Sequence, residues 1–416
     1  MSSIPFHKPS IGQGEIKEVL DCLRTGWLTT GPRVKQFEAE FAQYVHQPHA
    51  VAVNSCTAAL HLALEAIGLK AGDTVVVPTM TFAATAEVVR YFNAKPLLVD
   101  CRPEDLNVDV AEAKRKIEKA LAEGERVTAI IPVHYAGQIG DTYGVAELAS
   151  RYNLKVIEDA AHCCPAYYRA HANSPWKSVG TEAEITCFSF YANKPITTGE
   201  GGMACTKYQD HADRMRIMSL HGISRDAWKR YTAEGSWHYE IIAPGYKYNL
   251  TDIAAAIGLH QVRKADQLHQ RRAERARLYA ELLREVDELV LPQSMPNRIH
   301  SWHLYSVRLK LDRLSIGRSE VISEMKRFGI GTSVHWMPLH LHPYYETNFG
   351  YSPNDCPCAA AIYPELISLP LYPDMTFEQV ESVCRTLKDI IVRSRIIVPA
   401  SIQQVPAATS QEPQAA

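Results

Sequence analysis

Short apolar runs alternate with amphipathic stretches over the first half of the chain. Runs rich in branched residues are typical of buried strands, whereas apolar residues that recur every three to four positions are typical of helices. The predicted strands lie at 49–53, 74–78, 96–100, 127–133, 155–159 and 185–190. The predicted helices lie at 14–24, 33–45, 57–67, 83–93, 109–122 and 143–152. This alternation predicts an α/β fold with a mainly parallel sheet between layers of helices.

The pattern changes near residue 250. The elements predicted beyond this point are a helical stretch at 252–286, a strand at 303–309, a run at 330–337 and helices at 318–327 and 376–394. Their order predicts a second, smaller α+β unit. We therefore expect a large domain at 1–255 and a small C-terminal domain at 256–396. The polar, Ala- and Pro-rich segment 397–416 is predicted to be a disordered tail.

The composition narrows the class of protein and its compartment. With 416 residues, the chain is long for a single hydrophobic core. Its formal net charge of −2 provides no basic field for nucleic acid or for an anionic membrane. No apolar run is long enough to span a bilayer, and MSSIPFHKPS lacks the pattern of a secretory signal. We expect a cytoplasmic protein that binds neither nucleic acid nor membrane.

The ten cysteines do not predict a metal site. Only Cys163 with Cys164, and Cys356 with Cys358, lie close together in sequence. Neither pair is followed by a second pair at zinc-binding spacing. We expect reduced thiols that pack as small hydrophobic side chains, and no bound metal.

One lysine occupies an unusual place, in the segment CFSFYANKPITTGEGG at 187–202. Lys194 follows the strand predicted at 185–190 and precedes the pair Gly201-Gly202. Taken alone, a lysine at such a place more commonly extends into solvent than acts in catalysis. The residues at the other strand ends make a catalytic role for Lys194 the better explanation.

Several strand ends carry residues that suit a flat, anionic cofactor. Thr57 and Ala58 open a helix after the first strand, where hydroxyls and free amides can hold a phosphate. Asp159 ends a strand, where a carboxylate can hold a cationic ring nitrogen. Phe82 could stack on a ring, and His162 could bond to a ligand. Each also has a common structural explanation, as a helix cap or as part of the core.

Taken together, these residues favour one cofactor. Ligands of open parallel sheets sit at the carboxyl ends of the strands, where all of these residues fall. A phosphate cradle, an aromatic plate, a carboxylate for a pyridinium and an amine for an imine are the requirements of pyridoxal 5'-phosphate. Lys194 then has a role, because its amine can form the imine and later move a proton between substrate and cofactor carbons.

Six motifs resemble those of the DegT/StrS-type nucleotide-sugar aminotransferases, which are fold-type I pyridoxal phosphate enzymes. The similarity is collinear over roughly residues 4–395. The motifs are GWLTTGP (26–32), NSCTAALHLAL (54–64), PTMTFAATA (78–86), EDAAH (158–162), FSFYANKPITTGEGG (188–202) and PGYKYNLTDIAAAIGL (244–259). The resemblance implies a seven-stranded, mainly parallel sheet in the large domain, and a smaller C-terminal α+β domain.

The resemblance also implies a role for each matched residue. Lys194 is the imine-forming lysine, Asp159 pairs with the pyridine nitrogen, and Phe82 stacks on the ring. His162 lies near the ring oxygen, where many relatives carry Gln. The residues that hold the phosphate are Thr57, Ala58 and Ser189.

A homodimer with shared active sites is a further implication of the resemblance. The segment 245–251 would complete the site of the partner subunit, with Asn249 or Lys247 at its cofactor phosphate. The sequence leaves the choice between these two open. Arg33, Lys247 and the basic loop 225–230 are possible contacts for the diphosphate of a nucleotide-linked substrate.

Two further segments match those that line the sugar-nucleotide cleft of the family. The first is the loop 27–32, with Trp27, Thr29 and Thr30. The second is 335–340, with His335, for which a packed aromatic turn is an equal alternative. We expect these side chains to bind substrate.

The sequence therefore predicts transfer of an amino group, from glutamate, to a nucleotide-linked keto-sugar. The 4-keto position is favoured, in amino-sugar synthesis for a cell-surface polysaccharide. A sugar lyase or dehydratase is one alternative, but that branch of the family carries histidine where this chain has Lys194. A non-catalytic regulatory protein is another, and the intact Lys194 and Asp159 argue against it.

Overall fold

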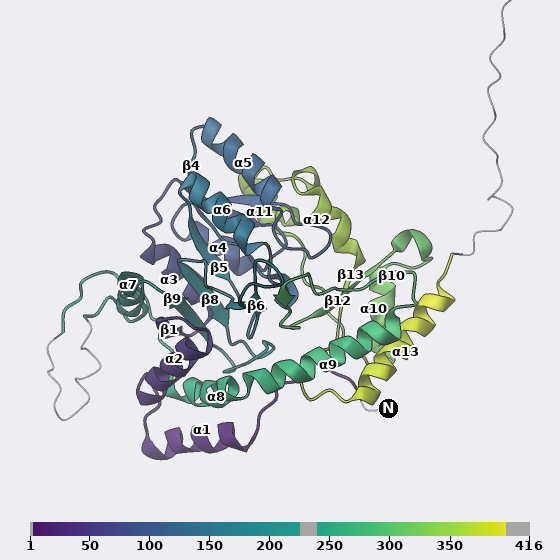
Figure 1. The fold of residues 1–416 in the computed structure, drawn as a ribbon, viewed down its shortest axis with the longest axis horizontal. Coiled ribbons are helices and arrows are strands. Elements are labelled where there is room, and N and C mark those ends of the chain that lie inside the picture. Colours follow the sequence, from purple (N-terminus) through teal and green to yellow (C-terminus); the bar gives the residue numbers. More distant parts are fainter. Residues whose placement is uncertain (1–2, 225–238, 397–416) are drawn as a thin grey trace, which may run out of the picture.

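Seven strands form the central sheet of the computed structural model, which describes residues 3–224 and 239–396 (Figure 1). The order across the sheet is β1-β9-β8-β5-β4-β2-β3. Strands β2, β3, β4, β5 and β8 are mutually parallel, which confirms the predicted α/β fold with a mainly parallel sheet. The strands span His49–Val53 (β1), Asp73–Pro78 (β2), Lys95–Val99 (β3), Arg126–Ile130 (β4), Lys155–Asp159 (β5), Ile185–Ser189 (β8) and Gly202–Thr206 (β9).

Strand β9 was not predicted, and it is the one that runs against its neighbours. It pairs antiparallel with both β1 and β8. Its sequence, GMACT, has one β-branched residue and no aromatic one, and so lacks the branched run typical of a strand. The helix that follows it, α7 (Gln209–Ser219), is mostly polar and was also missed.

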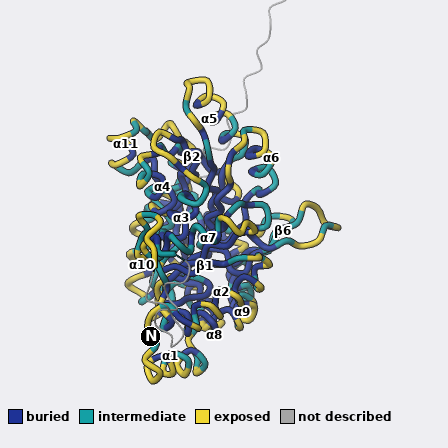
Figure 2. The backbone as a smooth tube through the Cα atoms, turned by 90° about the vertical axis from the view of Figure 1, so that its left-hand side faces the viewer, coloured by how far each residue is buried: buried dark blue, intermediate teal, exposed yellow. Residues whose placement is uncertain are grey.

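Successive residues of the strands pack beneath helices on opposite faces of the sheet. Val75 and Val77 of β2 join the core under α3, α4 and α7, whereas Val76 packs under α5 and α6. Figure 2 shows this buried interior in dark blue between exposed outer turns. The helices of this half span Gln13–Thr25 (α1), Pro32–Tyr44 (α2), Cys56–Ala66 (α3), Ala83–Arg90 (α4), Val110–Ala122 (α5) and Thr142–Tyr152 (α6).

The second half of the chain builds a smaller sheet with its own core. Strands β10 (Leu289–Val290), β12 (Tyr305–Leu309) and β13 (Leu366–Leu369) form it. The predicted helix 252–286 is two helices, which meet at Lys264. The helices are α8 (Asp252–Arg263), α9 (Ala265–Leu283), α10 (Arg318–Arg327), α11 (Pro343–Phe349), α12 (Pro357–Ile362) and α13 (Phe377–Arg393). A third, minor sheet joins β6 (Tyr167–Tyr168), β7 (Lys177–Ser178) and β11 (Arg298–Ile299).

The domain boundaries remain predictions. Helix α8 runs through the predicted boundary at residue 255 and packs against α1 and α2. At the other end of the chain, Ile4 bridges to Ile330 and packs into the C-terminal core. The predicted tail 397–416 and the basic loop 225–230 lie outside the described residues. Within the described part, every helix is too short or too polar to cross a membrane.

Candidate active site

A cavity of about 310 Å³ opens at the carboxyl ends of β5 and β8, beside the first turn of α3. This is the place where open parallel sheets hold their ligands. Residues from the C-terminal half close its other side. The predicted site residues that line it are Thr57, Phe82, Asp159, His162, Ser189, Lys194 and His335.

Lys194 enters the cavity from the connection between β8 and β9. Its amide donates to the Tyr191 carbonyl at 3.0 Å, and the Thr197 hydroxyl donates to the Phe190 carbonyl at 3.1 Å, so the loop is ordered by its own polar groups. Burial lowers the pKa of the Lys194 amine to about 8, against the opposing charges of Cys56 and Asp159. No ion pair joins Lys194 to a carboxylate among the described residues. The amine is therefore partly neutral near pH 7 and free to react.

Asp159 lies at the end of β5 with both carboxylate oxygens engaged. Oδ2 accepts a hydrogen bond of 2.8 Å from the Thr85 hydroxyl, and Oδ1 accepts one of 3.1 Å from the Ala161 amide. No helix follows β5, so the helix-cap explanation of Asp159 is wrong. Burial raises the pKa of this carboxyl, although its hydrogen bonds and the Lys194 charge oppose the change. A cation placed in the cavity would favour the ionised form.

The first turn of α3 forms one end of the cavity. Ser55 caps this helix, because its hydroxyl accepts the Ala58 amide at 3.1 Å. The Ala58 amide is therefore already used, while those of Cys56 and Thr57 lack a carbonyl partner one turn earlier in the helix. A Cβ atom on Gly202 would lie 2.4 Å from the Ser55 carbonyl oxygen, so only glycine lets β9 approach this turn.

Aromatic rings form part of the cavity wall. Phe82 is 59% exposed, so core packing does not explain it. Its ring lies 6.4 Å from that of Trp336, which in turn stacks on His162 at 4.9 Å. The His162 Nδ1 accepts the Ala136 amide at 3.1 Å, so its proton resides on Nε2. The segment 335–340 is thus both a packed turn and part of the cavity wall.

His303 also lines this cavity, and sequence reasoning placed it only in a strand. Both of its ring nitrogens are buried and have no hydrogen-bond partner in the part of the chain that the structure describes. Behind it lies Arg272, which is 1% exposed and donates to the Leu371 carbonyl at 2.9 Å, with no carboxylate partner among the described residues. Its Nε and Nη2 atoms are unpartnered. His303 lies two residues before β12, and nothing in its local sequence marks it as part of a site.

The remaining predicted residues lie away from the cavity of their own chain. The Asn249 amide donates to the Thr30 hydroxyl at 2.7 Å, and that hydroxyl donates to the Leu250 carbonyl. The indole of Trp27 donates to the Thr30 carbonyl, while the Thr29 carbonyl accepts the Asp252 amide. These contacts hold the loop 27–32 against the start of α8.

Two cations that could meet a diphosphate differ in how far they are already engaged. Arg33 forms ion pairs with Glu18 and Asp21. The side chain of Lys247 is exposed and lies on the same segment as Asn249. Of the two, Lys247 is the cation left available to a ligand or to a second subunit.

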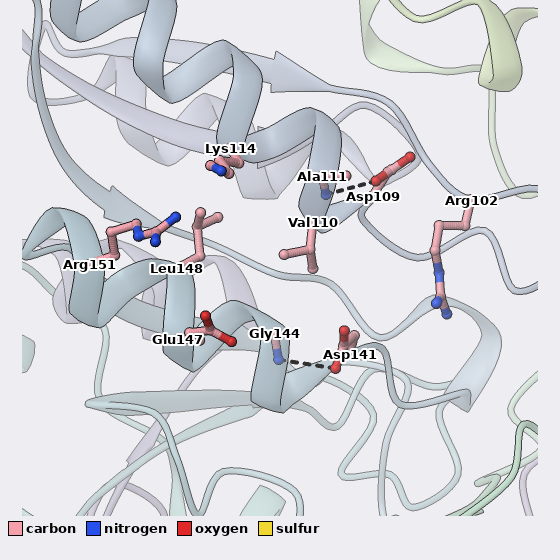
Figure 3. A pocket seen from close by; sticks show the side chains of 10 residues that line it. All are labelled: Arg102, Asp109, Val110, Ala111, Lys114, Asp141, Gly144, Glu147, Leu148 and Arg151. Atoms are coloured by element: carbon pink, nitrogen blue, oxygen red, sulfur yellow. Dashed lines mark hydrogen bonds between the residues drawn. The ribbon is translucent and has the colours of Figure 1, made fainter.

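A larger hollow, of about 390 Å³, lies between α5 and α6 (Figure 3). Its aspartates are already used as helix caps, because Asp109 accepts the Ala111 amide and Asp141 accepts the Gly144 amide. Among the described residues, none of the polar side chains that line it is buried without a partner. Its chemistry is that of two solvated helix ends, and we place the active site at Lys194 instead.

The cavity at Lys194 fits pyridoxal 5'-phosphate. It combines an amine without an ion-pair partner, a buried carboxylate, an exposed aromatic ring and free amides at a helix N-terminus. The unpartnered nitrogens of His303 add hydrogen-bonding capacity that a ligand can fill. Thr57, Ser189, Asp159 and Lys194 would hold the phosphate, the ring nitrogen and the aldehyde carbon of this cofactor.

Comparisons with known proteins agree with this assignment. Residues 9–388 match the model of the DegT/DnrJ/EryC1/StrS aminotransferase family. The uncharacterized protein MJ1066 of Methanocaldococcus jannaschii is 47% identical, over 95% of this chain and 99% of that protein. The spore coat polysaccharide biosynthesis protein SpsC of Bacillus subtilis is 42% identical, over 93% of this chain and 97% of that protein.

A solved structure gives the same answer for the fold and the cofactor. The putative sugar aminotransferase Spr1654 of Streptococcus pneumoniae, in its PMP form, superposes with a TM-score of 0.84 and 31% identity. The superposition covers 94% of this chain and 98% of that one, and the same protein is also known in its PLP form. The chain therefore belongs to the DegT/DnrJ/EryC1/StrS aminotransferase family, whose enzymes depend on pyridoxal phosphate.

Proposed function

We propose that this enzyme transfers an amino group from glutamate to a nucleotide-linked keto-sugar, with the 4-keto position favoured. The observation that carries the proposal is the buried, unpaired amine of Lys194 in a cavity with Asp159. A related protein named for spore coat polysaccharide biosynthesis supports a role in making an amino sugar for a cell-surface polysaccharide. We propose the cytoplasm as its compartment.

The residues of the chain would divide the work as follows. Bound pyridoxal phosphate supplies an aldehyde that takes up the amine and a ring that withdraws electrons from the substrate carbon. Asp159 would hold the protonated ring nitrogen, and Phe82 would cover one face of the ring. Lys194, once released, would move the proton at the substrate carbon, for which a pKa of about 8 is well matched to neutral pH.

Glutamate as the donor is supported by the wall behind His303. Arg272 is a buried cation with unpartnered donors and no carboxylate partner among the described residues. His7 adds a further buried nitrogen, Nε2, without a partner among the described residues. Burial, and after it the charge of Arg272, lowers the pKa of His7 to about 4. A carboxylate-bearing donor would balance this charge and fill the open hydrogen-bonding positions.

A homodimer with shared sites is supported by the predicted site residues that do not line the cavity of their own chain. The loop 27–32 lies against the segment that carries Lys247 and Asn249, and together they form one region of the surface. Close to it in sequence, α1 exposes Ile16, Leu20 and Leu23 on one face. An apolar helix face of this kind suits a second copy of the chain, which would place Lys247 or Asn249 in the neighbouring cavity.

The test is to follow the visible absorption of the cofactor-loaded protein while glutamate is added. We expect glutamate to remove the band and to yield 2-oxoglutarate, and keto-sugar nucleotides to restore it with formation of an amino sugar identified by mass. Borohydride should fix the cofactor covalently in the wild type and not in Lys194→Ala. A band that glutamate leaves unchanged, together with loss of water from the sugar, would show a lyase instead. Failure to bind the cofactor at all would indicate a non-catalytic protein.

A further inference from the structure

Two thiols from distant parts of the chain meet beside one carboxylate. Cys101 directly follows β3 and Asp100, whereas Cys358 lies in the first turn of α12. A carboxylate oxygen of Asp100 and the two sulfur atoms all lie within 4.8 Å of one another. This cluster is separate from the residues that line the cavity at Lys194.

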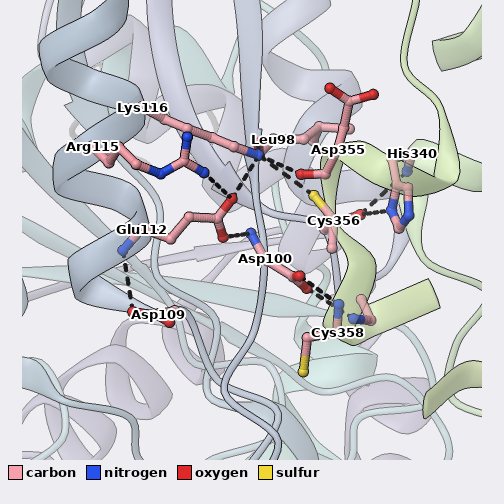
Figure 4. A network of polar contacts seen from close by, with 12 residues as sticks. Leu98, Asp100, Asp109, Glu112, Arg115, Lys116, His340, Asp355, Cys356 and Cys358 are labelled. Carbon is pink, nitrogen blue, oxygen red and sulfur yellow. Dashed lines mark hydrogen bonds and ion pairs between the residues drawn. The ribbon is translucent and has the colours of Figure 1, made fainter. Parts of the chain in front are cut away.

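Asp100 holds the backbone on both sides of this cluster, and Figure 4 shows its hydrogen bonds to the first turn of α12. Its Oδ1 accepts the Cys101 amide at 2.8 Å and the Ala359 amide at 2.9 Å, while its Oδ2 accepts the Cys358 amide at 2.7 Å. A single carboxylate therefore fixes the main chain at both cysteines. The two thiols are held near each other by the fold, and a change of side-chain rotamer is enough to vary their separation.

The two thiols differ in access and in acidity. Cys101 is 2% exposed, whereas Cys358 is only partly buried. A hydrogen bond from Cys101 lowers the pKa of the Cys358 thiol, and the same contact raises that of Cys101. The accessible sulfur is thus the better thiolate, and the buried one lies behind it.

The neighbouring Cys356 has none of these properties. It is fully buried, and its sulfur lies 3.6 Å from the Lys116 ammonium. Figure 4 shows its side chain turned toward Lys116, with the Cys358 sulfur pointing the other way. Two cysteines separated by one residue therefore face different partners, which provides a matched internal control.

We propose that Cys101 and Cys358 form a thiol–disulfide site that exchanges with a small disulfide such as glutathione disulfide. The Cys358 thiolate attacks one sulfur of glutathione disulfide, forming a mixed disulfide and releasing one glutathione thiolate. The Cys101 thiol then loses its proton to solvent and attacks the Cys358 sulfur, releasing the second glutathione. The protein loses two electrons and two protons, and one glutathione disulfide becomes two glutathione molecules.

The bond would join the end of β3 to α12, and the packing carries its effect toward the active site. Cys101 and Tyr135 belong to one buried apolar cluster, against which Cys358 and Trp336 also pack. Tyr135 meets the Trp336 ring edge-on at 5.9 Å and donates to the His335 carbonyl at 2.6 Å. Oxidation would thus restrict the segment that carries the cavity residues His335 and Trp336.

The test uses the full-length enzyme loaded with cofactor, incubated with glutathione disulfide and then alkylated. We expect two fewer alkylated thiols, a peptide that contains a Cys101–Cys358 disulfide, and a melting temperature raised by about 3 °C or more relative to the reduced form. Dithiothreitol should reverse all three changes. Disulfide mapping and melting do not depend on which substrate the enzyme uses, so the result is independent of the proposed function.

Three variants separate this exchange from non-specific oxidation. Cys101→Ser should retain glutathione on Cys358, because the second step is blocked, and Cys358→Ser should react at neither position. Cys356→Ser should form the Cys101–Cys358 bond as the wild type does. The proposal is overturned if all ten thiols stay alkylatable, if the wild type stops at the glutathione adduct, or if one zinc ion per chain already blocks both sulfurs.

Discussion

The Thr85 hydroxyl donates a hydrogen bond of 2.8 Å to Oδ2 of Asp159. Because the Ala161 amide binds the other oxygen, the carboxylate is fixed in one orientation before any ligand arrives. Because its one proton goes to Asp159, the Thr85 hydroxyl accepts a hydrogen bond of 2.7 Å from the Thr81 hydroxyl, so a chain of two hydroxyls supports the carboxylate. These hydrogen bonds keep the buried Asp159 carboxylate in the orientation that a cationic ring nitrogen requires.

Replacing the carboxylate should weaken the cofactor more than replacing its support. We expect Asp159→Asn to lose about 10–100-fold in affinity for pyridoxal phosphate, because a charge-assisted hydrogen bond contributes about 1.5–3 kcal/mol. The half-reaction with glutamate should slow by about 100-fold or more, as for loss of a preorganised charge. Spectroscopic titration of the cofactor and stopped-flow absorption measure the two effects.

Thr85→Val is the matched control, because it keeps the Asp159 carboxylate and removes one of the two hydrogen bonds that orient it. Its expected loss is about 1 kcal/mol, or roughly fivefold in affinity. If Asp159→Asn bound the cofactor as tightly as Thr85→Val, the assignment of Asp159 to the ring nitrogen would be wrong.

The lowered pKa of Lys194 leads us to expect two effects of pH, one on the rate of cofactor capture and one on stability. The rate at which the apoenzyme captures pyridoxal phosphate should rise about tenfold per pH unit and level off near pH 8, because only the neutral amine reacts. The apoenzyme should also gain stability as pH rises above 8, since the folded state then binds fewer protons at this amine than the unfolded state. Below pH 8 the amine is protonated in both the folded and the unfolded state, and burial of this charge lowers the stability of the folded state.

Lys194→Met tests the stability effect directly. The variant should melt higher than the wild-type apoenzyme at pH 7, and the difference should shrink between pH 8 and pH 10. A capture rate that keeps rising to pH 10 would instead mean that the amine has an ordinary pKa.

The parallel core was predictable, and the antiparallel strand was not. Runs such as Val75–Val77 are branched and buried on both faces, so their pattern identifies strands without tertiary information. Strand β9 begins with Gly202 because the chain must approach the Ser55 carbonyl there, a tertiary requirement that has no periodic signature. The break between α8 and α9 at Lys264 likewise follows from packing and not from proline or glycine.

Some residues of the active site were predictable from the sequence and others were not. Lys194 and Asp159 follow recognisable strands in motifs whose order matched a family, so sequence reasoning identified them and the structure places both in one cavity. His303 and Arg272 carry no local motif, because their chemistry depends on burial without a partner. Only coordinates reveal an unfilled hydrogen-bond position.

Gly202→Ala should disturb the phosphate end of the site. The added Cβ would lie 2.4 Å from the Ser55 carbonyl oxygen, so the first turn of α3 must shift. We expect a loss of about 1–3 kcal/mol in the free energy of unfolding, as for other overpacked positions, and at least a tenfold weaker affinity for pyridoxal phosphate. Met203→Leu in the same strand conserves volume and should alter the affinity little. Wild-type affinity in Gly202→Ala would show that this turn does not hold the phosphate.

His303→Phe should separate stability from function. Removing two buried, unpartnered nitrogens should leave the melting temperature unchanged or raise it, because an unsatisfied polar group costs about 1–3 kcal/mol. The KM for glutamate should rise at least tenfold if His303 contacts the donor. His61→Phe is the contrasting variant, since it removes a hydrogen bond of 3.0 Å to the Tyr248 hydroxyl. It should lower stability and leave the KM for glutamate unchanged, and a common effect of both variants on KM would contradict the assignment.

Mixing two inactive variants tests whether two subunits share each site. Lys194→Ala lacks the reacting amine, and we expect Lys247→Ala to lose most activity because its exposed ammonium reaches the partner's cofactor phosphate. Random exchange of subunits makes about half of the dimers mixed, and one of the two sites in each mixed dimer contains both wild-type lysines. Activity should therefore return to about one quarter of the wild-type value.

The control is a mixture of Lys194→Ala with Asp159→Asn. Both residues line the cavity of the same chain, so every site in a mixed dimer carries one of the two defects and no activity should return. The same mixture with Asn249→Ala in place of Lys247→Ala decides which residue crosses to the partner. Because the Asn249 amide is held by Thr30 at 2.7 Å, we expect Asn249→Ala to act mainly on its own loop and to keep most activity as a homodimer. An Asn249→Ala homodimer that is inactive and regains activity in the mixture, together with no recovery for Lys247→Ala, would reverse that assignment. If both variants are inactive alone and neither mixture recovers, shared sites are excluded.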